Sequence, residues 1–256
     1  MLKPLPLLDK KVLVPRGEKQ AKTFSRMVKQ YGGIPIEIPL IAFRPIRHNV
    51  HLGKCLEVMD TYDWIIFTSN IAVETFLACT TSDSRLPKIA VIGKKTEEAL
   101  HERGIPVEFL PSSYVAEVFA SEFLKYINQG TRVLIPKGNL ARDYIAETLK
   151  KAGALVEEVV IYENFLPEES RQTLVSILQE HKLDILLFTS SSTVDHFMQV
   201  VKEHGLSSSL SESIIGCIGP VTQRTLQNYG LPVHVTPKEY TVEKMIKSTI
   251  EYLDRI

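Results

Sequence analysis

Short apolar runs alternate with amphipathic stretches along the chain. Residues 12–14, 64–67 and 89–92 are apolar runs of the length that buried parallel strands have. Helical spacing follows the first run, because Ala21, Phe24 and Val28 would line one helix face before Gly32-Gly33 ends the helix. This alternation of strand and helix predicts an α/β fold with parallel sheets that carry helices on both faces.

The pattern occurs twice. Residues 11–17 (KVLVPRG) reappear as 132–138 (RVLIPKG), and residues 63–69 (DWIIFTS) reappear as 184–190 (DILLFTS), each at a shift of 121 positions (132 − 11). Two later blocks, at 92–96 and 104–107, recur at a shift of 126 (218 − 92), and Pro111 and Tyr114 are matched by Pro237 and Tyr240. Four matching blocks in the same order indicate an internal duplication.

Two long extended segments do not fit the simple alternation. They cover residues 34–43 and 156–165, and a proline follows each of them. Ten residues at about 3.3 Å each span roughly 33 Å, enough to pass from one lobe to another. Two such crossings would build each lobe from parts of both halves. The pattern itself fits two lobes in sequence equally well.

Size and charge narrow the classes of protein. The 256 residues are enough for two modest domains, and 44% hydrophobic residues allow each to bury a core. The 30 basic and 30 acidic residues balance, which argues against nucleic acid as the main partner. The start, MLKPLP, has two prolines where a signal peptide would be apolar, and no segment approaches the apolar length of a membrane span. We therefore expect a cytoplasmic protein with no membrane partner.

Candidate binding residues follow the predicted strands. In open parallel sheets ligands bind beyond the carboxyl ends of the strands, where backbone N–H groups and helix dipoles meet anions. The residues at these positions are small, hydroxylic or basic: Arg16, Thr68, Ser69, Asn70, Gly93, Thr96, Lys137, Ser190, Ser191, Gly219 and Thr222. Such residues suit carboxylate or phosphate. Ordinary helix caps would account for the hydroxyl residues, and solvated charges for Arg16 and Lys137.

The sequence lacks the motifs of several other kinds of catalytic, nucleotide-binding and metal site. The chain lacks the phosphate-loop, dinucleotide-binding and nucleophile-elbow patterns. Its three cysteines form no C-x-x-C pair, so neither zinc nor a disulfide framework is indicated. His48-x-x-His51 is the nearest histidine pair, and its polar neighbours indicate a surface turn. We predict no metal site and no cofactor.

Tyr162 is the acid–base candidate. It lies in the middle of the second long segment. A tyrosine can stack on a flat ligand and donate a hydrogen bond or a proton. A tyrosine packed in a strand with its hydroxyl at the surface would fit the same position.

Together these motifs resemble the uroporphyrinogen-III synthase family over almost the whole chain. The resemblance is carried by YDWIIFTS at 62–69, by VIG-x-x-T at 91–96, by VIY at 160–162, by FTSS at 188–191 and by IGP-x-T at 218–222. It implies two similar, flavodoxin-like α/β lobes with parallel sheets, joined by two long extended connectors, with a cleft between them. One domain would combine residues 1–38 with 166–256, and residues 43–160 would form the inserted domain.

The resemblance also implies a reaction. The family's enzyme is a lyase of haem biosynthesis that needs neither cofactor nor metal. It cyclises hydroxymethylbilane, a linear tetrapyrrole, to uroporphyrinogen III with loss of water and inversion of the last pyrrole ring. Tyr162 matches the family's tyrosine and becomes the candidate catalytic acid. Its binding positions match Thr68, Ser69, Thr96, Ser190, Ser191 and Thr222.

Two expectations about partners and two alternatives complete the hypothesis. We expect a monomer that makes transient contact with hydroxymethylbilane synthase, which supplies the substrate. The main alternative is a two-lobed small-molecule binding or sensor module without catalysis, although the single tryptophan, Trp64, lies inside an apolar run and could not stack on a sugar. The second alternative is an enzyme acting on a phosphorylated small molecule.

Overall fold

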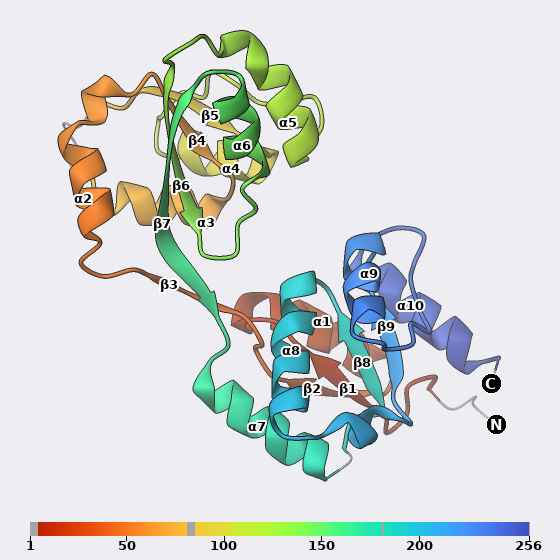
Figure 1. The fold of residues 1–256 in the computed structure, drawn as a ribbon. Helices are drawn as coiled ribbons and strands as arrows, with labels where there is room; N and C mark the ends of the chain where they lie inside the picture. The colour runs from red at the N-terminus through yellow and green to blue at the C-terminus, as the bar shows by residue number, and fades with distance from the viewer. Residues whose placement is uncertain (1–4, 81–84, 181, 256) are drawn as a thin grey trace. The chain divides into compact units, whose positions relative to one another are not determined.

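The chain forms two compact units. A computed structural model describes residues 5–80, 85–180 and 182–255 (Figure 1). The first unit consists of Met1–Ala42 and Phe165–Ile256, and the second of Phe43–Asn164. The chain therefore leaves the first unit once and returns to it once.

The first unit is a parallel sheet between two layers of helices. In chain order its elements are β1 (Lys11–Val14), α1 (Glu18–Gln30), β2 (Ile34–Glu37), α7 (Glu168–Gln179), β8 (Ile185–Phe188), α8 (Ser191–Glu203), β9 (Ile214–Cys217), α9 (Pro220–Asn228) and α10 (Val242–Leu253). The strand order is β2-β1-β8-β9, and the pairs along it are parallel. A bridge from Gly216 to Val235 adds a fifth extended segment at one edge.

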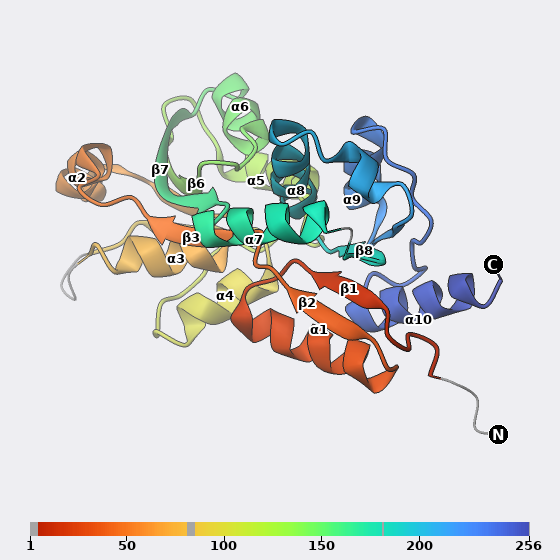
Figure 2. The same ribbon diagram turned by 90° about the horizontal axis from the view of Figure 1, so that it is seen from below.

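Alternate residues of the central strands supply two cores in this unit. Val12 and Val14 of β1 pack with α1 and α10, which cover the same face of the sheet in Figure 2. Leu13 between them packs with residues of α7, α8 and α9 on the other face. Successive side chains of a strand point to opposite faces, so a strand covered on both faces must be apolar throughout.

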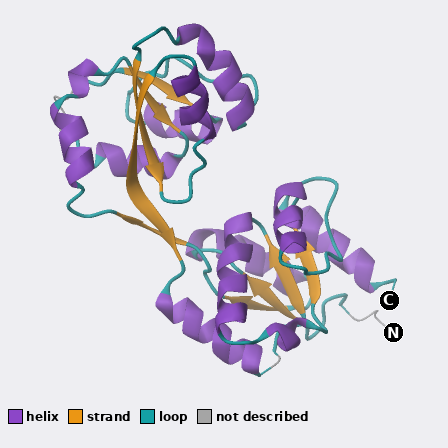
Figure 3. Ribbon diagram, viewed as in Figure 1, coloured by secondary structure: helices purple, strands orange, loops and turns teal. Residues whose placement is uncertain are grey.

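The second unit has the same layered construction. Its elements are β3 (Ala42–Pro45), α2 (Val50–Glu57), β4 (Trp64–Phe67), α3 (Asn70–Leu77), β5 (Lys88–Val91), α4 (Lys94–His101), α5 (Ala116–Phe123), β6 (Arg132–Gly138), α6 (Tyr144–Lys151) and β7 (Leu155–Phe165). The strand order is β3-β7-β6-β4-β5, and Figure 3 shows the strands in orange with purple helices around them. One core lies under α2, α3 and α4, and an aromatic core that includes Trp64, Phe119 and Phe123 lies under α5 and α6.

The sequence repeat explains why the two sheets match. At the shift of 121, β6 corresponds to β1 and β4 corresponds to β8. The order β7-β6-β4-β5 thus reproduces β2-β1-β8-β9. Each sheet combines the first strands of one repeat with the last strands of the other. Two lobes formed by consecutive halves, the arrangement that the sequence left open, do not fit this pairing.

Of the two predicted extended segments, one is a single strand in the structure and the other is divided. Residues 156–165 lie in one long strand, β7. The run 34–43 is divided, because β2 ends at Glu37 and β3 begins at Ala42. Pro39 lies in the gap and has no N–H to continue a ladder. Ile38 and Leu40 on either side of it are buried in the core of the first unit.

The first strand of the second repeat also continues further than expected. Residues 136–138 were expected to end a strand directly before a helix, yet β6 runs through Gly138 and α6 begins at Tyr144. Within the described ranges, the structure contains no helix that combines the length and the apolar character required to cross a membrane.

Candidate active site at the strand ends

Ser69 and Tyr162 meet at the carboxyl edge of the second unit's sheet. Ser69 follows β4 and caps α3, where its Oγ accepts a hydrogen bond from the N–H of Ala72 at 3.1 Å. The same Oγ lies 3.1 Å from the hydroxyl of Tyr162 on β7. Thr68 and Asn70 flank Ser69, and Asn70 is the first residue of α3. The structure thus brings a tyrosine hydroxyl to a helix N-terminus that is rich in hydrogen-bond donors.

A β-bulge turns Tyr162 toward Ser69. Lys137 of β6 pairs with Val160 and Gly138 pairs with Tyr162, so Ile161 is an extra residue in β7. Before the bulge, Val156 packs against the core under α5 and α6. Unbroken alternation would direct Tyr162 to that face too, but its ring packs in the core under α3. An extra residue re-aims the side chains that follow it, and here it determines which face the tyrosine occupies.

Packing holds the Tyr162 ring from two sides. Tyr162 is 8% exposed, and Phe43 meets its ring edge-on with the centroids 5.9 Å apart. On the other side Gly138 approaches so closely that an added Cβ would lie 2.5 Å from the ring. Glycine is therefore required opposite the tyrosine.

This close approach gives a test. We expect Gly138→Ala to displace the Tyr162 ring, to weaken the Ser69 contact and to destabilise the second unit by about 1–3 kcal/mol. Chemical denaturation and near-UV circular dichroism would measure both effects. Gly53→Ala in α2 is the matched control, because an added Cβ there has nothing within 4 Å. Equal stability of the two variants would contradict the steric argument.

Lys137 is held by carboxylates. Its ammonium bonds Asp143 at 2.5 Å and Glu158 at 2.6 Å, and its side chain is 11% exposed. Burial opposes the charge of Lys137, but the hydrogen bonds to Asp143 and Glu158 outweigh it and raise the pKa above its usual range. Thr68, Lys137 and Glu158 line one pocket of about 280 Å³. The substrate-binding role expected for Lys137 stays a prediction, and an anion there would compete with two carboxylates.

The first unit has Arg16 at the position that corresponds to Lys137. Arg16 follows β1, and its Nε donates to the hydroxyl of Thr189 at 2.8 Å, at the end of the neighbouring strand β8. Burial lowers the pKa of the guanidinium, which still stays charged at neutral pH. Ser190 caps α8 by accepting from the N–H of Thr193, and Ser191 begins that helix. This edge therefore offers a cation and hydroxyls to an anion.

Gly93 and Gly219 precede equivalent helices in the two units. Each is the N-cap of its helix, α4 or α9, without a side-chain cap, so N–H groups of the first turn lack that partner. Thr96 and Thr222 lie in these first turns and are buried. The last residues of neighbouring strands pair with each other, Phe67 of β4 with Val91 of β5 and Phe188 of β8 with Cys217 of β9. The glycine turns that follow β5 and β9 therefore lie beside the serine caps that follow β4 and β8.

Two tyrosines beside these glycines were not among the predicted site residues. Tyr114 lies next to Gly93, and the ring of Tyr240 lies 3.2 Å from a Cβ added at Gly219. Both tyrosines are exposed. The repeat could have identified them, because the two positions are equivalent. They add flat aromatic surface to the strand ends of each unit.

One group of side chains in the described part of the chain could hold a metal ion. It comprises His51, Cys55 and Glu157. Glu157 lies near the start of β7, opposite Leu134, whereas Tyr162 pairs with Gly138 near its end. The group is therefore separate from the strand ends. Histidine pairing alone could not identify it, although the i, i+4 spacing of His51 and Cys55 was visible.

A family model and two full-length relatives carry the same description. A family model described as uroporphyrinogen-III synthase HemD matches residues 22–247. The chain is 30% identical over 250 residues to the uroporphyrinogen-III synthase of Synechococcus elongatus, covering 94% of each protein. It is also 30% identical over 252 residues to that of Chlorobaculum parvum, covering 95% of this chain and 99% of the relative.

Solved structures agree on the fold. A mutant uroporphyrinogen III synthase from Thermus thermophilus matches with a TM-score of 0.69 and 17% identity, covering 96% of this chain and 100% of that one. The Helicobacter pylori synthetase matches with a TM-score of 0.62 and 18% identity, covering 95% and 99%.

Proposed function

We propose that this chain, which belongs to the uroporphyrinogen-III synthase family, closes hydroxymethylbilane to uroporphyrinogen III. The reaction releases the terminal hydroxyl as water and inverts the last pyrrole ring, which makes the enzyme a cyclising hydro-lyase. The observation that supports it in the structure is the placement of the Tyr162 hydroxyl 3.1 Å from Ser69, at a helix N-terminus.

Tyr162 is the proposed general acid. Its O–H would donate to the leaving hydroxyl, and the departing water would leave an azafulvene cation on the first ring. The substituted position of the last ring attacks the methylene carbon of this cation and gives a spiro intermediate. The original bond from that position to the methylene of the third ring then breaks, and the unsubstituted α-carbon of the last ring bonds to that methylene instead. The proton that this α-carbon loses returns to the Tyr162 phenolate. Ser69 can accept or donate toward the Tyr162 hydroxyl, so it can orient the acid.

The remaining residues would bind and position the substrate. Hydroxymethylbilane carries eight carboxylates on a flexible chain and closes to the wrong isomer in water. The enzyme must therefore hold its first and last rings together, which is catalysis by positioning. Arg16, the hydroxyls and the free N–H groups at Gly93 and Gly219 offer suitable donors.

The finer expectations remain part of this proposal. They are a monomer, a cytoplasmic location and transient transfer of substrate from hydroxymethylbilane synthase. The alternative of a binding module without catalysis is not favoured, because the family match extends over residues 22–247.

A coupled assay tests the function directly. Hydroxymethylbilane is generated in situ, and the type I and type III products are resolved by chromatography. We expect type III to dominate when the full chain is present. Type I alone, formed at the uncatalysed rate, would refute the proposed activity.

A further inference from the structure

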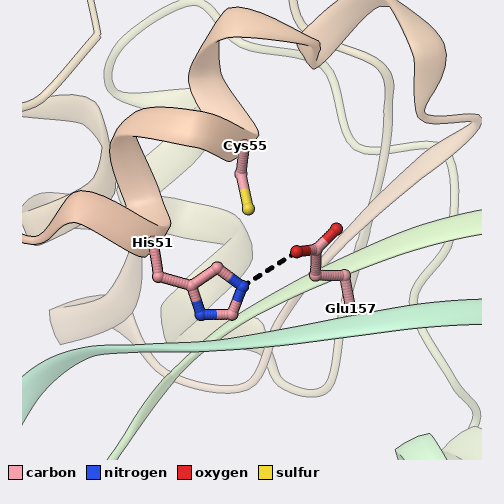
Figure 4. A group of neighbouring side chains, drawn as sticks. All are labelled: His51, Cys55 and Glu157. Carbon is pink, nitrogen blue, oxygen red and sulfur yellow. Dashed lines mark hydrogen bonds and ion pairs between the residues drawn. The ribbon is translucent and has the colours of Figure 1, made fainter.

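His51, Cys55 and Glu157 gather on the α2 side of the second unit. His51 and Cys55 are four residues apart and so share one face of α2, and Glu157 lies on the neighbouring strand β7 (Figure 4). The ring Nε2 of His51 is 2.8 Å from Oε1 of Glu157. One ligand atom from each residue lies within 4.8 Å of the others. Cys55 is 1% exposed, whereas the other two side chains reach solvent.

These separations are close to those around a tetrahedral ion. Bonds of about 2.3 Å to sulfur and about 2.0–2.2 Å to nitrogen and oxygen place neighbouring ligand atoms roughly 3.4–3.6 Å apart. The widest separation here is 4.8 Å or less, so closure needs a movement of about 1 Å. The solvent-exposed imidazole of His51 can supply it by side-chain rotation, while Cys55 stays in the core and Glu157 keeps its hydrogen bond from Tyr62.

The surrounding contacts already fix the carboxylate and the helix. Tyr62 donates to Oε2 of Glu157 at 2.6 Å, which leaves Oε1 directed at His51. A hydrogen bond of this kind orients a metal-ligating carboxylate. Asn49 caps α2 by accepting from the N–H of Leu52 and donates to the carbonyl of Val160 on β7, so it ties the helix to the strand.

An entry path and a balanced charge complete the conditions for a site. The exposed His51 faces solvent directly, and a pocket of about 560 Å³ that is lined by Tyr62 and Glu157, although not by His51 or Cys55, opens beside the group. A thiolate and a carboxylate would neutralise a divalent cation. Two cations also line the pocket: the ammonium of Lys150 bonds Glu158 at 3.1 Å, and the guanidinium of Arg132 lies over the Tyr62 ring.

The other unit serves as an internal comparison. At the shift of 121, the counterparts of His51 and Cys55 are Gln172 and Ser176 on α7, and the counterpart of Glu157 is Ile36 on β2. Ile36 packs against an apolar core there. The fold therefore forms the same helix-on-strand contact without these three residue types, so their presence in the second unit is not a requirement of the architecture.

We propose that His51, Cys55 and Glu157 form a binding site for Zn²⁺, with water as the fourth ligand. Thiolate with imidazole favours Zn²⁺ over Mg²⁺ or Ca²⁺. The bound ion would join α2 to β7 at the end of the sheet remote from Tyr162, so it would stabilise the second unit and take no part in ring closure.

Cobalt titration of the chelator-treated full chain tests the site. Co²⁺ bound by a thiolate gives an intense near-ultraviolet charge-transfer band. We expect one equivalent to produce this band and Zn²⁺ to abolish it. Cys55→Ser should remove the band, and Cys79→Ser, which changes an exposed cysteine outside the cluster, should keep it. No band in the wild type, or a band that survives Cys55→Ser, overturns the proposal.

Two further variants test the site without altering the buried cysteine. Glu157→Gln should weaken Zn²⁺ binding at least tenfold, and Tyr62→Phe about 10- to 100-fold by releasing the carboxylate. Zn²⁺ at a hundredfold excess over the wild-type Kd should raise the Tm of the wild type by about 5–10 °C and that of Glu157→Gln by at most about half as much. Equal Zn²⁺ affinity and equal Tm shifts in wild type and Glu157→Gln would exclude this ligand set.

Discussion

The Tyr162→Phe variant is expected to form uroporphyrinogen III at about one hundredth of the wild-type rate, or more slowly. Loss of a positioned general acid typically costs 10²–10⁴-fold. The phenyl ring keeps its contacts with Phe43 and Gly138, so the fold should be unaffected. Single-turnover kinetics with resolved type I and type III products would measure the effect.

A control separates loss of the acid from a general effect of removing a hydroxyl. Tyr126→Phe makes the same change at the exposed edge of the aromatic core, beside Phe109 and Phe123. It should retain wild-type turnover. If Tyr162→Phe also retained full turnover and product ratio, Tyr162 would be no more than a packing residue, and another donor would have to release the hydroxyl.

Lys137→Met is expected to lower the free energy of unfolding of the second unit by about 2 kcal/mol. The change removes the ammonium that bonds the largely buried Glu158 at 2.6 Å, and it leaves this carboxylate only the more exposed Lys150 at 3.1 Å. A largely buried carboxylate that loses its less exposed partner costs more than a lost surface ion pair. Urea denaturation of the full chain measures the change.

A matched variant and a rescue make the interpretation specific. Lys150→Met removes the more exposed partner of Glu158 and should cost less than about 1 kcal/mol. Adding Glu158→Gln to Lys137→Met should restore much of the stability. A stable Lys137→Met variant with weakened substrate binding would instead assign the ammonium to the substrate.

The ion pairs also set a pH dependence. A hydrogen bond from Lys137 lowers the pKa of Asp143, so this carboxylate stabilises the fold above its unfolded pKa and loses that contribution as the pH falls through the folded value. The pKa of Lys137 is raised in the folded state, so its contribution to stability is complete at pH values below the ordinary lysine pKa. That contribution is lost only as the pH rises through the raised value. The stability difference between wild type and Lys137→Met should therefore be retained at neutral pH and shrink toward acid.

Much of the fold was accessible from the sequence because it depends on local pattern. Apolar runs at β4 and β8 read directly as buried strands, and the repeat predicted that they would occupy equivalent places. The exchange of strands between repeats was not decided by the pattern. The exchange requires β1 to pair with β8 rather than with β4. Because β4 and β8 are alike in sequence, the apolar pattern cannot tell which of them β1 pairs with.

The site was less predictable, because its geometry depends on distant residues. Tyr162 was identified by its place in the chain, but the bulge that aims it arises from an extra residue, Ile161, that no turn or glycine marks. The sequence predicts Lys137 as a free strand-end cation, because its partner Glu158 lies in another strand and no local pattern shows that the two side chains meet. Glu157 is likewise 106 positions from His51, so no spacing rule could join them.

The interleaving of the two repeats constrains the order in which the protein can fold during synthesis. The N–H of Lys11 bonds the carboxylate of Asp184, a separation of 173 positions. At about 5–20 residues per second, β1 waits roughly ten to thirty seconds for β8 to be made. The second unit, continuous from Phe43 to Asn164, can complete its sheet within that interval. The first unit can therefore close only once β8 has been made, when the second unit has had time to fold, and until then β1 lacks the strand that pairs with it in the sheet.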